Sequence, residues 1–465
     1  MTLPEVIGVI HPLREAAGLR EACPIGGVVI DSREVEENSL FVALKGTRAD
    51  GADFVGEAFK RGAIAAIVSE EGFRKTPAEI LRTRPVLVVR NPVEALGDLA
   101  QAHRMRHRNI PLAAITGSSG KTTTREMLNC LLSRSRRVLC NLGNRNNLIG
   151  MPLTLLSLSE KHDAAVLEMG TNTPGEIARL SDIAIPDIGL ITNIAPAHLE
   201  GLGSLEGVAR EKGDLFRALG AKGIAVVNAS DLRVVREASR CFAEKMFYGV
   251  PMNDFHGRII SMSDTWMRIV VQTPAGEFTS AVGASGEHLL MNATAAAAMG
   301  FMLGLLPYEM EEGFAAFSSS PGRFHAEPLR GGGLLLDDSY NANPASVEAA
   351  LRALASLSRG RRTLVVFGDM LELGQVSSAS HYRIGCLMAS LKIGRLLAFG
   401  RDAVFTAKGA IETGMDSSAV SYFSDPLELS KAVRGFMEEG DVVLVKGSRG
   451  VQLDETAKDI RREWV

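Results

Sequence analysis

Short apolar runs recur along the middle of the chain, and longer stretches with helical spacing separate them. The runs occupy residues 112–116, 164–168, 188–192 and 224–228. A short apolar run bounded by polar residues predicts a buried strand. Because helical stretches lie between the runs, the pattern predicts a mostly parallel sheet covered by helices.

The first 108 residues show the same alternation with shorter elements. Strands are predicted at 28–30, 39–44, 64–68 and 85–90, and helices at 54–61 and from Pro92 onward. Asn91 suits the N-cap of the second helix, and Pro92 suits its first position. This helix ends in a basic cluster, residues 103–108, which we expect to complement the C-terminal dipole and lead into an interdomain linker.

Pro321 and Gly322 mark the start of a further α/β unit. Its strands are predicted at 334–338, 363–367, 396–399 and 442–446, with helices at 346–357 and 379–391. Before it, residues 258–282 read as a β-rich insertion with a hairpin turn at Ala275-Gly276. Residues 289–306 are uncharged but interrupted by polar residues and glycines, which predicts a buried core helix rather than a membrane span.

The patterning and the length of 465 residues predict an α/β protein of about three domains. We expect a small α/β N-terminal domain at 1–108, a central nucleotide-binding domain of the P-loop type at 109–320, and a Rossmann-like doubly wound domain at 321–465. Ligands of such sheets gather at the carboxyl ends of the strands. No internal repeat or low-complexity segment interrupts the pattern.

Composition and charge narrow the function classes. The formal net charge of −3 gives no strong field for nucleic acid or a membrane surface. The five cysteines are dispersed and form no Cys-x-x-Cys pair, which favours free thiols in a reducing compartment. The N-terminus lacks the basic start and apolar core of a signal peptide. We therefore expect a cytoplasmic protein that binds no nucleic acid and has no membrane span.

A glycine loop carries the strongest chemical signal. The strand at 112–116 leads into a run with two glycines and a Lys-Thr pair: Gly117, Ser118, Ser119, Gly120, Lys121, Thr122 and Thr123. Such a loop before a helix can turn backbone N–H groups toward a phosphate, while the lysine reaches the terminal phosphates and the threonine binds magnesium. The glycines are spaced more tightly than in the strict P-loop pattern. A glycine turn that merely joins a strand to a helix is the alternative.

Other polar residues follow the predicted strands. Glu168 ends an apolar strand in the same sheet as the glycine loop, which favours a magnesium role over a hydrated strand-end acid. His198 follows the next strand, and the pattern weighs a structural and a pocket position about equally. Lys212 stands in a charged helical stretch, and the pattern alone interprets it as a solvated lysine.

Two polar clusters follow strands of the C-terminal unit. Residues 337–344 contain two aspartates, a serine, a tyrosine and two asparagines, more hydrogen-bonding groups than a turn needs. We interpret them as a polar pocket that faces the central domain. Residues 446–450 offer two cations and a glycine turn, which suit an anionic ligand.

Together these stretches resemble the Mur ligase family over nearly the whole chain. The resemblance rests on the loop at 116–123, the Asn-rich segment 143–150, Glu168-Met169-Gly170, the segments 193–200 and 286–293, and the C-terminal segments 337–344, 366–374 and 446–450. The sequence Asn-Ala-Asn-Pro at 341–344 resembles the corresponding segment of the family branch that adds D-alanyl-D-alanine to UDP-N-acetylmuramoyl-tripeptide.

The resemblance implies roles that the pattern alone does not give. It makes Lys121, Glu168, His198 and Lys212 catalytic, with Lys212 carbamylated. It assigns two magnesium ions to Thr122, Glu168, His198 and Lys212. It extends the ATP contacts of the glycine loop to Asn292, Arg323 and Asp338. It places substrate contacts at Ser32, Arg33, Asn144, Asn341, Asn343 and Ser448. The pattern by itself reads Asp31-Ser32-Arg33 as a strand-end turn with a solvated arginine.

The implied activity is ATP-driven amide formation through an acyl phosphate, by an enzyme expected to be monomeric. Three alternatives stay open. One is a related Mur-type or folylpolyglutamate-type ligase that joins a different amino acid. A nucleotide-driven switch or partitioning ATPase is the second, and it would leave the C-terminal polar clusters unexplained. A non-catalytic scaffold is the third, which intact Lys121, Thr122, Glu168 and His198 disfavour.

Overall fold

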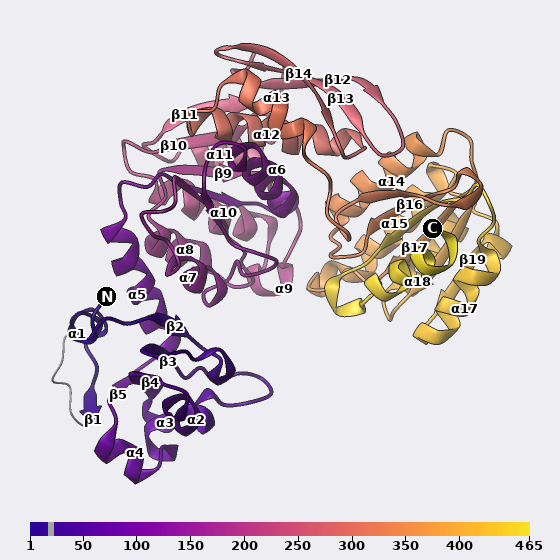
Figure 1. Ribbon diagram of the computed structural model, residues 1–465. Helices are drawn as coiled ribbons and strands as arrows, with labels where there is room; N and C mark the ends of the chain where they lie inside the picture. Colours follow the sequence, from indigo (N-terminus) through magenta and orange to yellow (C-terminus); the bar gives the residue numbers. More distant parts are fainter. Residues whose placement is uncertain (17–22) are drawn as a thin grey trace. The chain divides into compact units, whose positions relative to one another are not determined.

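The computed structural model describes residues 1–16 and 23–465 and has the predicted α/β character (Figure 1). The chain divides into two compact units. The first consists of Met1–Ala113, Arg137–Gly170 and Glu176–Asp187, and the second of Ala114–Arg136, Thr171–Gly175 and Ile188–Val465. All five cysteines are free thiols, as their spacing predicts.

The N-terminal part of the first unit is a five-stranded sheet covered by helices on both faces. In sheet order its strands are β1 (Arg14–Ala16), β5 (Val86–Val89), β4 (Ala65–Ser69), β3 (Ser39–Val42) and β2 (Gly27–Val29). The helices are α1 (Leu3–Ile10), α2 (Val55–Lys60), α3 (Glu70–Lys75), α4 (Ala78–Thr83) and α5 (Pro92–Arg106). Strands β2 to β5 are parallel, and β1 is an antiparallel edge strand. Leu40 and Ile67 face α5, whereas Phe41 and Ala66 face α2.

Helix α5 starts as predicted and ends in a buried cation. The Asn91 side chain accepts a hydrogen bond from the Val93 N–H at 3.0 Å, which confirms the N-cap. Arg104 is fully buried and donates to the carbonyl groups of Ala184 and Ile110 and, at 3.0 Å, to the Asp187 carboxylate. Burial lowers the pKa of Arg104 to about 10. The basic cluster therefore supplies an internal clamp as well as charge for the helix end.

We expect Arg104→Ala to lower the free energy of unfolding by about 3 kcal/mol, because it leaves the carbonyl groups of Ala184 and Ile110 without this buried donor and removes one of the donors to Asp187. Urea unfolding measures the change. Arg106→Ala is the matched control, since Arg106 forms a solvent-exposed ion pair with Glu5, and such pairs contribute little to stability. Equal losses in the two variants would contradict the clamp.

A six-stranded sheet contains the predicted central strands. Its order is β11 (Glu244–Tyr248), β10 (Ile224–Asn228), β9 (Ile188–Ile191), β6 (Leu112–Thr116), β8 (Ala164–Glu168) and β7 (Val138–Cys140). The accompanying helices are α6 (Lys121–Ser133), α7 (Gly150–Leu155), α8 (Glu176–Ala184), α9 (Leu199–Leu202), α10 (Leu205–Ala218) and α11 (Leu232–Ala238). Strands β9, β10 and β11 are parallel, and so are β7 and β8. The prediction found the four inner strands and missed both edge strands.

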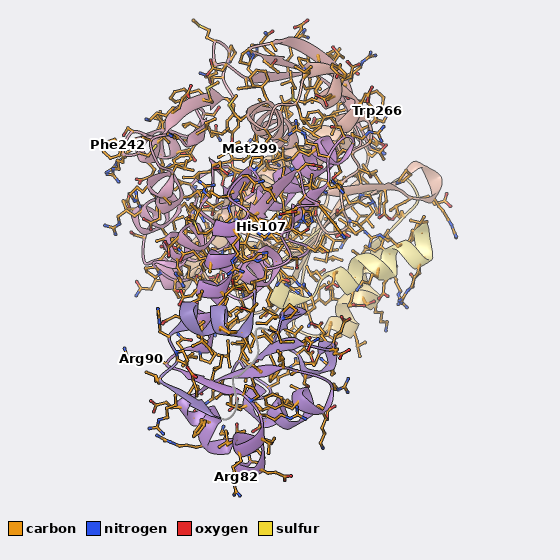
Figure 2. All side chains as sticks on the ribbon, turned by 60° about the vertical axis from the view of Figure 1, so that its left-hand side comes forward. Arg82, Arg90, His107, Phe242, Trp266 and Met299 are labelled. Carbon is orange, nitrogen blue, oxygen red and sulfur yellow. The ribbon has the colours of Figure 1, made fainter. Side chains whose placement is uncertain are left out.

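The predicted β-rich insertion is a three-stranded antiparallel sheet. It consists of β12 (His256–Met262), β13 (Met267–Thr273) and β14 (Gly276–Val282), followed by α12 (Glu287–Met302) and α13 (Pro307–Ala315). Thr273 pairs with Gly276, which confirms the hairpin turn. Residues 293–300 of α12 are buried, Met299 among them, whereas Phe242 and Trp266 lie at the surface (Figure 2). No described helix is long and apolar enough to cross a membrane.

The C-terminal part of the second unit has a six-stranded sheet with helices on both faces (Figure 1). In sheet order the strands are β15 (His325–Pro328), β16 (Leu334–Asp338), β20 (Val442–Lys446), β17 (Thr363–Gly368), β18 (Arg395–Phe399) and β19 (Val420–Phe423). The helices are α14 (Pro344–Ser358), α15 (Ser377–Ser390), α16 (Ala403–Glu412), α17 (Pro426–Phe436) and α18 (Asp454–Trp464). All strands except β15 are parallel, as a doubly wound unit requires.

Candidate active site

The loop between β6 and α6 has a shape that requires its glycines. Gly117 and Gly120 have φ angles of 147° and 78°, in the region that side chains disfavour. A Cβ atom on Gly117 would overlap the Thr192 hydroxyl, and one on Gly120 would lie 2.5 Å from Asn292 Oδ1. The loop therefore packs against the end of β9, and Asn292 of α12 lies beside it. The ATP contact of Asn292 stays a prediction.

We expect Gly117→Ala to lower kcat/KM for ATP-dependent phosphate release by about 10²-fold, because the new Cβ must displace the loop from Thr192. Gly435→Ala is the control: a Cβ at Gly435 meets open space and should leave the rate unchanged. Steady-state kinetics at several ATP concentrations separates the two. Wild-type rates in Gly117→Ala would show that the loop shape is unimportant.

Asn193 holds the loop in place. Its carbonyl accepts from the Ser118 N–H at 3.0 Å, and its side chain accepts from the Ser119 N–H at 3.0 Å. The Ser118 hydroxyl bonds the backbone of Ala195, and the Thr192 hydroxyl donates to the Ser119 carbonyl. In this conformation the N–H groups of Ser118 and Ser119 donate to Asn193, a contact that the sequence did not reveal.

Lys121 begins helix α6 and folds back over the loop. Its ammonium donates to the Gly117 carbonyl at 2.7 Å. Thr122 and Thr123 follow in the first turn and are buried. The N-cap is Gly120, which provides no side-chain oxygen for the first-turn N–H groups. A helix start of this kind, with a lysine beside it, suits a phosphate.

Lys212 lies on α10 with only 1% of its side chain exposed, so its interpretation as a solvated lysine was wrong. Burial, and after it the nearby Lys121 ammonium, lowers the pKa of Lys212 well below its usual range. The neighbouring Glu211 accepts hydrogen bonds from Thr171 and from the Gly175 N–H. An amine that loses its proton readily is the form that reacts with carbon dioxide to give a carbamate.

The environment of Lys212 fits the predicted magnesium and carbamate chemistry. A buried ammonium beside a second ammonium is unfavourable, and carbamylation would replace it by an anion with oxygen donors. Magnesium prefers oxygen ligands of this kind. The described residues contain no group of three or more His, Cys, Asp or Glu side chains able to hold a metal. The predicted magnesium ligands would therefore need to include the oxygen atoms of Thr122 and of carbamylated Lys212.

His198 precedes α9 and contacts the loop after β17. Its Nδ1 atom lies 2.5 Å from Glu372 Oε2, and this hydrogen bond lowers the pKa of the Glu372 carboxyl. The backbone of His198 is left-handed, with φ 52°. Sequence reasoning noted the segment that contains Glu372 but gave that residue no role.

Lys446 and Asp338 form a buried ion pair at the ends of β20 and β16. The Lys446 ammonium lies 2.5 Å from Asp338 Oδ2 and also donates to the Asn341 carbonyl at 3.0 Å. Burial raises the pKa of Asp338, and the lysine opposes that shift. Asp338, predicted to bind ATP, is thus fixed by a cation that the sequence placed in an anion-binding cluster.

Two arginines flank the Tyr340 ring. The Arg323 guanidinium carbon lies 3.7 Å from the ring centroid, and that of Arg449 lies 5.5 Å from it. Cation–π contacts of this kind hold a guanidinium in place. Arg323, a predicted ATP contact, is therefore held near Asp338, and like Lys446 it opposes the rise that burial causes in the pKa of Asp338.

The predicted substrate residues of the C-terminal unit are largely engaged within the protein. Asn343 caps α14 and donates to the Ser118 carbonyl at 3.1 Å, so the C-terminal unit touches the glycine loop. The buried Ser448 hydroxyl accepts from the Leu371 N–H and donates to the Ala342 carbonyl. Asn341 is exposed, and its side chain accepts from the Ala342 N–H.

The other predicted residues belong to the first compact unit. Glu168 is 2% exposed, and its carboxylate accepts from Asn146 at 2.7 Å. Asn141, which the prediction missed, bonds both backbone groups of Glu168. Asn144 is exposed in the turn before α7.

The Asp31-Ser32-Arg33 segment forms a local turn. Arg33 is 81% exposed and pairs with Asp31 at 2.6 Å, which lowers the pKa of Asp31 to about 2. Ser32 is buried. This is the turn that the pattern alone predicts, and its substrate role stays a prediction.

Comparison with known proteins gives consistent matches along the chain. Residues 24–104, 115–300 and 322–449 match family models described as the Mur ligase family catalytic domain, the Mur ligase middle domain and the Mur ligase glutamate ligase domain. The UDP-N-acetylmuramoyl-tripeptide–D-alanyl-D-alanine ligases of Bacillus subtilis and Escherichia coli are 34% and 37% identical, over 95% and 99% of this chain and 94% and 98% of theirs.

Solved structures agree with these matches. A crystal structure of MurF from Acinetobacter baumannii has a TM-score of 0.87 at 29% identity and covers 99% of both chains. A structure of MurF ligase from Thermotoga maritima in complex with ADP has a TM-score of 0.81 at 30% identity, over 94% of this chain and 97% of that one. The predicted three-domain α/β fold class is confirmed.

Proposed function

Because the chain belongs to the Mur ligase family, we propose that it joins D-alanyl-D-alanine to UDP-N-acetylmuramoyl-tripeptide in a reaction driven by ATP. The products are UDP-N-acetylmuramoyl-pentapeptide, ADP and phosphate, so the enzyme serves peptidoglycan precursor synthesis. The observation that carries this proposal is the match to ligases of that name over 94% or more of both chains.

The reaction has two balanced steps. The terminal carboxylate of the tripeptide attacks the γ-phosphorus of ATP, and ADP leaves, which gives an acyl phosphate. The amine of D-alanyl-D-alanine then attacks the acyl carbon, phosphate leaves with the bonding pair, and the new amide nitrogen loses a proton. Two anions must approach each other in the first step, so positive charge at the γ-phosphate is the main requirement.

The proposed site residues can meet this requirement. The N-terminus of α6 and the Lys121 ammonium offer positive charge at the loop, and Asn292 borders it. Magnesium, with Thr122, Glu168, His198 and carbamylated Lys212 as the proposed ligands, would add charge neutralisation when bound. Asp338 and Arg323 are held where ATP contacts are proposed, and Asn343 already reaches the loop.

The remaining assignments are also proposals. We propose domain boundaries near residues 108 and 320, two magnesium ions, a monomer and a cytoplasmic location. Substrate contacts are proposed for Ser32, Arg33, Asn144, Asn341, Asn343 and Ser448. Light scattering of the purified protein would test the monomer.

Phosphate release tests the function. We expect purified protein with ATP, magnesium and UDP-N-acetylmuramoyl-tripeptide to release phosphate rapidly only when D-alanyl-D-alanine is present. Mass spectrometry should show that the nucleotide product has gained one dipeptide. Single amino acids, glutamate among them, are tested as alternative amine acceptors in place of the dipeptide, since a folylpolyglutamate-type ligase would prefer glutamate. Equal phosphate release with and without the dipeptide would refute the assignment.

A further inference from the structure

Two segments that are far apart in the sequence meet at His198. The imidazole Nδ1 lies 2.5 Å from Glu372 Oε2, although 174 positions separate the residues. A second contact joins the same segments, because the Glu200 N–H donates to the Glu372 carbonyl at 3.2 Å. The side-chain contact is therefore part of a two-point junction between the start of α9 and the loop after β17.

Both partners have an unfavourable backbone conformation. The φ angles of His198 and Glu372 are 52° and 63°, and neither residue is glycine. Side chains seldom adopt this left-handed region, and such residues persist where the surrounding structure fixes them. The backbone at each side of the contact is thus shaped to present its side chain to the other.

The loop that carries Glu372 is fixed by neighbouring elements. Asp369 accepts hydrogen bonds from the first N–H groups at α16, at 3.0 Å from Asp402 and 2.7 Å from Ala403. The Met370 N–H donates to the buried His381 ring at 2.9 Å. The Leu371 N–H donates to Ser448 at 2.9 Å. Successive residues are thus anchored up to the position before Glu372.

We propose that Glu372 is a positioning residue that fixes the tautomer and the orientation of His198. A carboxylate only accepts hydrogen bonds, so His198 must carry its proton on Nδ1, which leaves the Nε2 lone pair free. A histidine that binds a metal commonly donates its other ring N–H to a carboxylate in this way. The inference rests on the proposed function, in which His198 helps to hold magnesium.

The proposal adds a role for the C-terminal unit. Glu372 lies in the 321–465 segment and His198 in the 109–320 segment. The geometry of His198 thus depends on the contact between these parts of the second compact unit. The 321–465 segment would then affect the metal site without supplying a ligand to it.

The first test observes His198 directly. Nitrogen-15 NMR of protein labelled at histidine, with His198→Gln used to assign the signal, reports which ring nitrogen carries the proton. We expect the Nδ1–H form in the wild type, largely the same form in Glu372→Gln, whose amide oxygen can accept the bond, and its loss in Glu372→Ala. An unchanged His198 signal in Glu372→Ala would overturn the proposal.

The second test measures the magnesium requirement of phosphate release. We expect Glu372→Ala to raise the magnesium concentration for half-maximal rate by about tenfold or more, with the KM for ATP at saturating magnesium changed less than about twofold. Glu372→Gln should stay near the wild type. Glu348→Ala removes a partly exposed carboxylate of α14 and is the matched control.

The outcomes separate this proposal from the proposed function. A changed tautomer in Glu372→Ala without a changed magnesium requirement would support the contact but overturn its role in magnesium binding. Absence of ligation by the wild type would refute the proposed function, and the NMR signal would still decide whether Glu372 fixes His198. A loss of folding in Glu372→Ala would be recognised by urea unfolding, and Glu372→Asp, which keeps the charge but shortens the reach, would then replace it.

Discussion

Replacing Lys121 by alanine is expected to lower kcat/KM for ATP-dependent ligation by about 10²–10³-fold. The Lys121 ammonium lies at the start of α6 and over the glycine loop, bonded to the Gly117 carbonyl at 2.7 Å. Its charge should stabilise the γ-phosphate as the substrate carboxylate approaches, and alanine removes that charge. Coupled phosphate release measures the effect, and Lys121→Arg should recover only part of the rate because a guanidinium differs in shape from an ammonium.

Lys222→Ala is the matched control for this variant. Lys222 is an exposed lysine of the same compact unit and should have no effect on the rate. Urea unfolding of Lys121→Ala should show a change in stability that is small beside the loss of activity, since the hydrogen bond to the Gly117 carbonyl contributes only about 1 kcal/mol. A Lys121→Ala enzyme with nearly full activity would remove the basis for a phosphate role of this loop.

Lys212→Ala is expected to cause a loss of similar size, about 10²-fold or more, for a different reason. Lys212 is buried near Lys121, and burial lowers its pKa, which favours the neutral amine, the form that reacts with carbon dioxide. The carbamate would supply the magnesium ligand oxygens. Lys212→Arg should also be inactive, because a guanidinium does not form a carbamate under these conditions. Short carboxylic acids such as acetate should partly restore Lys212→Ala.

Direct detection completes the Lys212 test. Carbon-13 NMR of protein equilibrated with labelled bicarbonate should show one carbamate signal that is absent from Lys212→Ala. Removal of dissolved carbon dioxide should lower the rate reversibly. Full activity of Lys212→Arg would contradict the carbamate.

The sequence predicted the inner strands of the three α/β sheets and the edge strand β2, but it missed the other edge strands of these sheets. Apolar runs such as 112–116 and 442–446 identify strands that are buried on both faces. Strands β7 and β11 have neighbours on one side only and contain partly exposed residues, so their pairing partners decide their structure more than their own composition does. The three-residue β1 escaped prediction for the same reason.

The candidate site was predictable where its chemistry is local. The residues proposed to bind phosphate in the glycine loop are consecutive in the sequence, so their spacing alone indicated a phosphate site. The sequence did not show that Lys212 is buried. Helix α10 contains several charged residues, and the pattern does not tell which of them face the core. The resemblance to the Mur ligase family, and not the local pattern, predicted a catalytic role for Lys212.

Contacts between segments that are far apart in the sequence could not be predicted from local sequence patterns. Asn193 is 74 positions from Ser119, and Glu372 is 174 positions from His198. No local signal links such pairs, and only the folded chain brings each pair together. The roles of Asn193 and Glu372 therefore depend on the structure.

Isotope transfer tests the central claim, formation of an acyl phosphate, most directly. The tripeptide substrate would carry oxygen-18 in its terminal carboxylate and react with ATP and D-alanyl-D-alanine. We predict that each released phosphate contains one oxygen-18 atom, because the carboxylate oxygen that attacks the γ-phosphorus leaves with the phosphate. Unlabelled phosphate, released while the dipeptide is being joined, would contradict this account.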